Sequence, residues 1–205
     1  MSLFNKMLAS VGIGSATVDT KLEKSRYTAG EIIRGNVEVT GGNTDQDVDR
    51  IYLTLYTTYI REANDRKYTD TAAICRFQVS EPFTIGAGEK KVIPFSFEIP
   101  YTTPVTAGKT RIWVQTELDI KMAVDPTDKD FIEVNASPLA NEVLGAVKRL
   151  GFRLREVECE KAPLRLRAPH VFIQEFEFKA TNPTYRRRLD ELEVTFINQS
   201  ADHIE

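Results

Sequence analysis

The sequence predicts an all-β protein of the immunoglobulin-like sandwich type, in which one short helix separates two β regions. Two observations carry this prediction. Segments of alternating apolar and polar residues follow one another along the chain, and turn-forming residues connect them, which is typical of β-sandwiches. Away from the chain ends, one segment near residue 140 has a convincing helical pattern, and strand patterns lie on both sides of it.

The strand pattern is clearest in residues 27–40. Ala29-Gly30 predicts a tight turn, and a strand follows it at residues 31–40. Strand side chains alternate between the two faces of a sheet, so one face of this strand holds Ile33, Gly35, Val37 and Val39. Further strands are predicted at residues 16–22, 48–60, 68–80, 92–99 and 111–122. Pro94 marks residues 92–99 as an edge strand.

Two groups of aspartates interrupt the strands. Asp125, Asp128 and Asp130 predict a solvated turn, and only a short extended piece is expected after them, at residues 131–134. A second group follows Gly42, at residues 45–49. A calcium loop would also need a central glycine and a terminal glutamate, and neither group has both. We therefore expect turns and no metal site.

Residues 137–151 have the pattern of a capped helix. Ser137 is a natural N-cap, Pro138 occupies the first helical position and Gly151 follows the end. The expected apolar stripe consists of Leu139, Val143, Ala146, Val147 and Leu150. Three more strands are predicted at residues 152–161, 171–180 and 189–198. The predicted division is therefore a β-sandwich at 1–136, a linker helix at 137–151 and a partial sandwich at 152–205.

Near the amino terminus, apolar residues recur at helical spacing, at Leu3, Phe4, Met7 and Leu8. One interpretation is a short amphipathic helix that docks on its own domain. The alternative is a helix that touches a membrane, although Lys6 alone gives little attraction to anionic lipid.

Composition excludes several classes of protein. Lys and Arg total 27 against 30 Asp and Glu, for a net charge of -3, and no basic arm suggests a nucleic-acid partner. No secretory signal and no membrane-spanning apolar run is visible, which predicts a cytoplasmic protein. Cys75 and Cys159 are then expected as free thiols, with one long-range disulfide as the alternative.

The residues needed for catalysis do not come together in the sequence. His170 and His203 are the only histidines, and neither has a cysteine or serine motif beside it. Gly108-Lys109-Thr110 resembles the end of a phosphate-binding loop, but Thr103 replaces the required glycine and a strand follows where a helix should. The sequence thus predicts no enzyme, no cofactor and no metal.

Two features are candidates for partner binding. Arg186, Arg187 and Arg188 follow a turn and can grip phosphate or carboxylate groups, although such a run also occurs as a solvated turn that protects a strand edge. Trp113 interrupts the polar face of its strand. It is either an exposed anchor for a partner or a residue covered by a loop or by the amino-terminal helix.

Three features in this order resemble the arrestin-like superfamily, whose members join two β-sandwiches in tandem. They are Tyr27-x-x-Gly30-Glu31-x-x-x-Gly35-x-Val37, the long strand at 48–60, and the strand at 92–99 that leads through a loop to 111–122. Ala29 stands where that superfamily usually has proline. Residues 137–152, Gln174-Glu-Phe-Glu-Phe178 and Asp190-Glu-Leu-Glu-Val194 resemble, more specifically, the bacterial sporulation-control proteins of the stage-zero protein M type.

The resemblance implies a scaffold that regulates sporulation through protein–protein contacts. It also implies a complete second sandwich, whereas residues 152–205 supply about three strands, so we expect a carboxy-terminally truncated chain that forms a homodimer or strand-mediated oligomer through residues 151–205. The alternative function is a trafficking-type adaptor that contacts the membrane, or cytoskeletal or cell-division partners.

Overall fold

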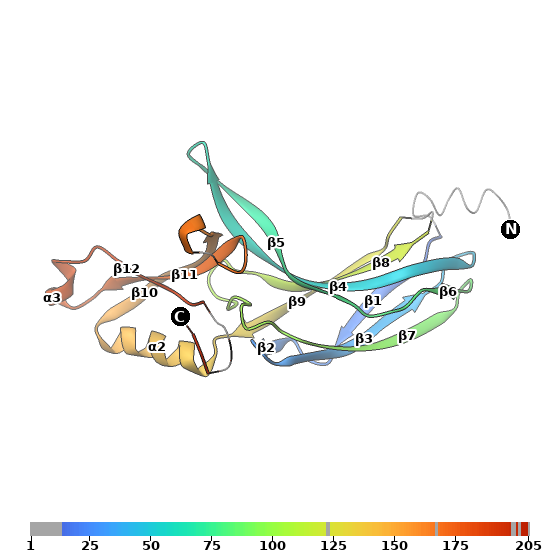
Figure 1. Ribbon diagram of the computed structural model, residues 1–205, viewed down its shortest axis with the longest axis horizontal. Coiled ribbons are helices and arrows are strands. Elements are labelled where there is room, and N and C mark those ends of the chain that lie inside the picture. The colour runs from blue at the N-terminus through green and yellow to red at the C-terminus, as the bar shows by residue number, and fades with distance from the viewer. Residues whose placement is uncertain (1–13, 122–123, 167, 198–199, 201, 205) are drawn as a thin grey trace.

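A computed structural model describes residues 14–121, 124–166, 168–197, 200 and 202–204. The predicted amino-terminal helix, with Leu3, Phe4, Met7 and Leu8, lies outside the described residues. Within them the molecule is elongated, with the strands of residues 17–135 at one end and helix α2 with strands β10 to β12 at the other (Figure 1).

The smaller sheet of the amino-terminal sandwich has three antiparallel strands, β1 (Thr17–Leu22), β3 (Ile32–Thr40) and β7 (Lys90–Glu98). Burial alternates along β3 as predicted, with Ile33, Val37 and Val39 in the core. Among the described strands, β7 pairs with β3 alone, so Pro94 lies on an edge strand, where its missing N–H is tolerated.

The larger sheet runs β12-β11-β10-β4-β8-β9-β2, with β5 and β6 also paired to β4. Its amino-terminal strands are β2 (Arg26–Thr28), β4 (Gln46–Ala63), β5 (Arg66–Gln78), β6 (Phe83–Ile85), β8 (Ile112–Ile120) and β9 (Thr127–Asn135). Their inner faces pack on the smaller sheet around one apolar core, which includes Ile33, Leu53 and Val114. The burial of these branched side chains stabilises the sandwich.

Strand β9 corrects one prediction. The chain is extended from Thr127 to Asn135, so Asp128 and Asp130 belong to a strand and not to a solvated turn. The reason is that these aspartates have specific surroundings: Asp128 Oδ2 accepts a hydrogen bond of 2.7 Å from the Thr20 backbone N–H in β1. Burial, followed by repulsion from Asp128, raises the pKa of Asp130 to about 6.

Helix α2 (Pro138–Arg149) begins as predicted, because Ser137 Oγ accepts a hydrogen bond from the Ala140 backbone N–H at 3.2 Å. The predicted apolar stripe is partly wrong. Ala140 and Val147 face the protein, whereas Leu139, Val143 and Leu150 are exposed. The helix therefore packs on the sheet with a neighbouring face, rotated away from the stripe read from the sequence.

The carboxy-terminal strands are β10 (Phe152–Lys161), β11 (Phe172–Ala180) and β12 (Leu192–Thr195), with the short helices η1 (Leu164–Leu166) and α3 (Pro183–Arg186) between them. Strand β12 is shorter than the predicted 189–198. One face of this sheet packs with α2 around Val157, Phe176 and Phe178. The β10 edge of this sheet continues the large sheet, because Glu160 of β10 pairs in parallel with Ile60 of β4.

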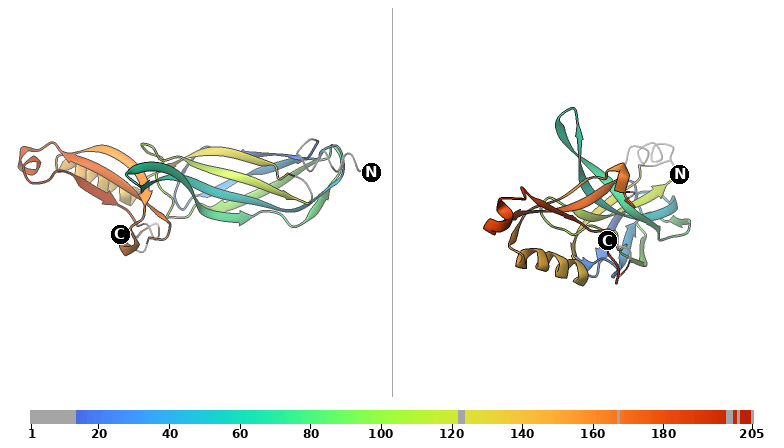
Figure 2. Two further views of the ribbon diagram at one scale, coloured as in Figure 1. Left: turned by 90° about the horizontal axis from the view of Figure 1, so that it is seen from above. Right: turned by 60° about the vertical axis from the view of Figure 1, so that its left-hand side comes forward.

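Strands β4 and β5 form a long hairpin that projects from the body of the molecule (Figures 1 and 2). Its tip is a tight turn at Asn64 and Asp65, which both have positive φ values, 52° and 57°. Asn and Asp tolerate this left-handed conformation better than other residues with a side chain. The base of the hairpin packs on the carboxy-terminal sheet, where Tyr59 stacks on Phe172.

Candidate interaction site

The loop between β7 and β8 fastens the amino-terminal sandwich to the carboxy-terminal sheet. Val105 and Gln174 of β11 exchange two hydrogen bonds of 2.7 Å each, between the Val105 backbone and the Gln174 side-chain amide. Gly108 lies so close to β10 that a Cβ atom there would stand 2.2 Å from the Val157 carbonyl oxygen. Only glycine, with φ at 57°, fits this contact.

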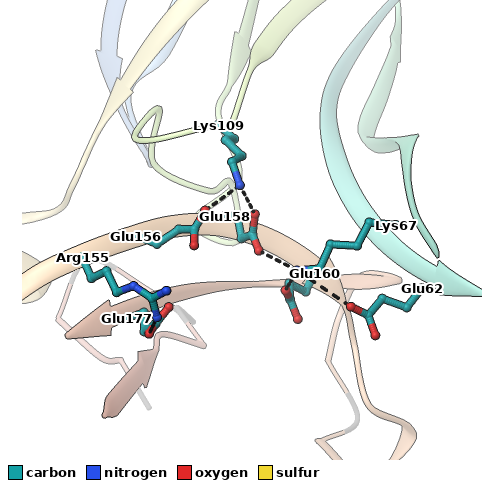
Figure 3. A network of polar contacts seen from close by, with 8 residues as sticks. All are labelled: Glu62, Lys67, Lys109, Arg155, Glu156, Glu158, Glu160 and Glu177. Atoms are coloured by element: carbon teal, nitrogen blue, oxygen red, sulfur yellow. Dashed lines mark hydrogen bonds and ion pairs between the residues drawn. The ribbon is translucent and has the colours of Figure 1, made fainter. Parts of the chain in front are cut away.

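Beside this contact, the outward face of β10, β11 and β12 carries seven glutamates, which we call the acidic face. They line an open hollow of about 300 Å³ together with Lys67 and Arg155. Figure 3 shows, from close by, part of the network of polar contacts on the acidic face. The seven residues are Glu156, Glu158, Glu160, Glu175, Glu177, Glu191 and Glu193.

Strand pairing places these glutamates directly opposite one another. Glu156 pairs with Glu177, which in turn pairs with Glu193, so one row of the sheet carries three carboxylates. Glu158 pairs with Glu175 in the adjacent row. Like charges directly opposite each other destabilise a sheet, so this arrangement requires compensation.

Four basic residues supply that compensation in part. Lys109 Nζ lies 2.5 Å from Glu156 Oε1 and 3.1 Å from Glu158 Oε2 (Figure 3). Lys67, from the β4–β5 hairpin, lies 3.5 Å from Glu158 Oε1 and 3.7 Å from Glu160 Oε1. Arg155 pairs with Glu177, and Lys179 lies 3.0 Å from Glu191 Oε2. Four cations face seven carboxylates.

The excess of negative charge changes the proton affinity of the face. Burial, followed by the neighbouring Glu158 and Glu175, raises the pKa of Glu160 to about 7. Burial and repulsion from Glu193 and Glu158 raise the pKa of Glu175. For Glu158, burial is the largest single effect and acts upward, but the hydrogen bonds from Lys109 and Glu160 and the charges of Lys109 and Lys67 together outweigh it and lower the pKa.

Two of the carboxylates are not compensated. Within the described part of the chain, neither Glu175 nor Glu193 takes part in an ion pair. The same residues contain no group of three or more His, Cys, Asp or Glu placed to hold a metal ion. The acidic face therefore has the chemistry of a surface for cationic groups.

The structure does not bring the predicted contact residues to this site. Arg186, Arg187 and Arg188 are exposed around the end of α3, and no ion pair among the described residues involves them. Trp113 lies in β8 and does not line the hollow. The acidic face and the arginine run are thus separate features.

Trp113 is not an exposed anchor, because only 5% of its surface is accessible. Tyr56 and Phe131 lie on either side of it in the sheet, with ring centroids 5.6 and 6.0 Å away, and Lys129 Nζ lies 3.9 Å above its ring. Neighbouring side chains of the sheet cover it, and the amino-terminal helix, one of the covers predicted from the sequence, lies outside the described residues.

The two cysteines and His170 are buried or half-buried. Cys75 and Cys159 are free thiols, as expected, and burial raises the pKa of each to about 11. His170 Nε2 lies 2.8 Å from Thr102 Oγ1, and burial lowers its pKa. None of the helices that the structure describes is long and apolar enough to cross a membrane.

Sequence reasoning missed the acidic face, although a signal was present. Glutamates recur with period two in each strand, at Glu156-x-Glu158-x-Glu160, at Glu175-x-Glu177 and at Glu191-x-Glu193. Period two places the members of each set on one face of their strand. That the three faces coincide depends on register, which the sequence alone does not specify.

Comparison with known proteins gives one consistent result. A family model described as "SpoOM protein" matches residues 4–205. Sporulation-control protein spo0M of Bacillus subtilis (strain 168) is 46% identical over 198 residues, which cover 96% of this chain and 76% of that protein. The crystal structure of Spo0M from Bacillus subtilis superposes with a TM-score of 0.88 at 44% identity, over 91% of this chain and 76% of that one.

These similarities confirm the predicted β-sandwich fold and the predicted resemblance, and they support a role in the regulation of sporulation. The relative is named for sporulation control and not for an enzymatic activity. This chain belongs to the SpoOM protein family.

Proposed function

We propose that this protein is a non-enzymatic, arrestin-like scaffold of the bacterial cytoplasm, and that it regulates sporulation through contacts with other proteins. The proposal assigns the main contact to the acidic face. A partner would present lysine or arginine side chains to the hollow and would pair with carboxylates that have no cation of their own.

The uncompensated pair Glu175 and Glu193 is the observation that carries this proposal. Seven carboxylates in three adjacent strands lower the stability of the sheet. Glu160 and Glu175 of this face have raised pKa values. Titratable side chains with shifted pKa values, kept in the fold although they lower its stability, cluster at functional sites. A basic partner removes the repulsion and gains charge-assisted hydrogen bonds at the same time.

The experiment compares proteins captured from an extract of sporulating cells by the intact chain and by a double variant, Glu175→Lys with Glu193→Lys. We expect a partner that the intact chain retains and the variant loses. The variant should keep its fold, since the substitutions relieve repulsion. Equal capture by both proteins would contradict the assignment to the acidic face.

A matched control reverses two exposed glutamates of the small sheet, Glu38→Lys and Glu98→Lys, which lie on β3 and β7. This control changes the net charge equally and should capture the same partner as the intact chain. A third protein with Arg186, Arg187 and Arg188 changed to glutamate tests the contact site predicted from the sequence. Loss of the partner in that protein alone would move the site to α3.

A further inference from the structure

The loop between β10 and β11, residues 162–171, has a composition unlike the rest of this acidic chain. No Asp or Glu occurs between Glu160 and Glu175, whereas that stretch contains Lys161, Arg165 and Arg167. Lys161 and Arg165 are exposed, and Arg167 lies outside the described residues. The loop therefore carries positive charge immediately beyond the acidic face.

Apolar side chains of the same loop stand in water. Leu164 is 99% exposed, Val171 is 60% exposed and Leu166 is 39% exposed. Single exposed leucines are ordinary on protein surfaces, but three apolar side chains within one short loop form a patch. Leu164 and Leu166 alternate with Arg165 in η1, so apolar and cationic groups are interleaved.

The fold holds this loop in place at its base. The Ala162 backbone N–H donates to the Val171 carbonyl at 2.9 Å and closes the loop. His170 lies against Thr102, and its ring stacks on Phe172 with centroids 5.1 Å apart. The tip with Leu164 thus remains in water while the base is anchored, and collapse onto the core would require breaking these contacts.

We propose that the surface formed by Lys161, Leu164, Arg165 and Leu166 is a contact site for an anionic lipid bilayer. Leu164 and Leu166 enter the boundary between headgroups and acyl chains, while Lys161 and Arg165 pair with lipid phosphates. Interleaved apolar and basic side chains are the combination that peripheral proteins use on anionic membranes, where each group alone binds weakly. The negative charge of the lipid complements the positive charge of the loop.

A bilayer suits this patch better than a protein partner does. Stable protein interfaces involve about 20–30 residues on each side, far more than this loop offers. The β4–β5 hairpin projects from the same side of the molecule as the loop (Figures 1 and 2). It carries Tyr68, whose ring has the Arg61 guanidinium 5.2 Å from its centroid. Tyrosine and arginine are both favoured at the membrane–water interface.

The first test is sedimentation of the full chain with vesicles. One set contains phosphatidylcholine alone, and the other contains phosphatidylcholine with an equal amount of phosphatidylglycerol. We expect the protein to sediment with the anionic vesicles and not with the neutral ones, and high salt should release it. Absence of the protein from the anionic pellet at low salt would overturn the proposal.

Variants assign the contact to the loop. Leu164→Ser should weaken the apparent vesicle affinity about tenfold, because a leucine no longer leaves water. Arg165→Ser should weaken it about fivefold. The matched controls are Leu150→Ser, at a leucine of equal chemistry exposed beside α2, and Arg187→Ser, next to α3. Equal losses in variants and controls would overturn the assignment.

Insertion is measured with a polarity-sensitive fluorescent label attached through Leu164→Cys. The label is selective because burial raises the pKa of Cys75 and Cys159 to about 11, so few thiolates form there at neutral pH. We expect a blue shift with anionic vesicles, and none for a label attached through Leu150→Cys. A chain that lacks residues 1–12 should bind anionic vesicles as well as the full chain does. If that chain loses binding while Leu164→Ser binds fully, the contact lies at the amino terminus, and the assignment to the loop is refuted.

Discussion

Lys109 and Glu158 join the two β regions of this molecule through an ion pair of 3.1 Å between Nζ and Oε2. Lys109 comes from the β7–β8 loop, and the Glu158 side chain, only 10% exposed, comes from β10. A carboxylate that is so nearly buried needs a partner, since burial otherwise favours its neutral form. The pair therefore links the position of the loop to the charge state of the acidic face.

We predict that Lys109→Met lowers the melting temperature at neutral pH. The substitution removes the ion pairs to Glu156 and Glu158 and leaves repulsion among the carboxylates. The pKa of Glu158 is lowered in the folded protein, so the stability from this carboxylate exists above its ordinary pKa of 4.5 and is lost as the pH falls through the folded value. Calorimetry should accordingly show a smaller difference between variant and wild type in acid.

The control for that prediction is Lys24→Met. Lys24 forms an ion pair of 2.8 Å with Glu31, and both side chains are about half exposed. Exposed ion pairs contribute little to stability. A melting temperature that falls as far for Lys24→Met as for Lys109→Met would show that Lys109 has no special role.

Gly108→Ala tests the close contact between the loop and β10. Alanine at φ of 57° is strained, and its Cβ would meet the Val157 carbonyl oxygen at 2.2 Å. We expect denaturant unfolding to show a loss of about 2–3 kcal/mol. Gly88→Ala is the matched variant, because Gly88 has a φ of 68° and no atom within 4 Å of an added Cβ. It should lose about 1 kcal/mol, and equal losses would refute the contact.

Glu160→Gln should stabilise the protein above pH 7. Its pKa of about 7 in the folded protein exceeds the ordinary value of 4.5, so the folded state binds this proton more tightly than the unfolded state does. Its contribution to stability thus falls as the pH rises from about 4.5 to about 7. Glutamine mimics the protonated form, and we expect about 1 kcal/mol of added stability at pH 8 after allowance for solvent screening, and none at pH 4. A gain that is the same at both pH values would contradict the assignment.

We also propose that residues 151–205 mediate self-association. Within the described residues, β12 pairs with β11 on one side and leaves its other edge open. Open edges pair readily with another strand. Light scattering at micromolar concentration should report a dimer or larger oligomer, and a monomer with an ordered carboxy-terminal sheet would contradict this expectation.

Much of the fold could be predicted because it depends on local pattern. Alternation gave β3 and β8, and the Ser137 cap gave the start of α2. The first half of strand β9 was missed because Asp128 and Asp130 are ordinary turn residues, and the hydrogen bond that holds Asp128 in a strand comes from Thr20, more than a hundred positions away.

The site was harder to predict because it depends on contacts between distant segments. The sequence excluded a phosphate-binding loop at Gly108-Lys109-Thr110 but gave Lys109 no other role. Its partners Glu156 and Glu158 lie in a strand that follows α2, and only the packing of the β7–β8 loop on β10 brings them together. The sequence left Trp113 either exposed or covered, and only the packing of Tyr56 and Phe131 from adjacent strands shows that it is covered.

Sporulation frequency tests the central claim, that the acidic face mediates control of sporulation, most directly. A host that lacks its own SpoOM family protein receives either this chain or the Glu175→Lys, Glu193→Lys variant, after both proteins are shown to unfold at the same temperature. We predict that the intact chain and the Glu38→Lys, Glu98→Lys control restore the frequency seen with the host's own protein, and that the acidic-face variant does not. Full restoration by the folded acidic-face variant would contradict the claim.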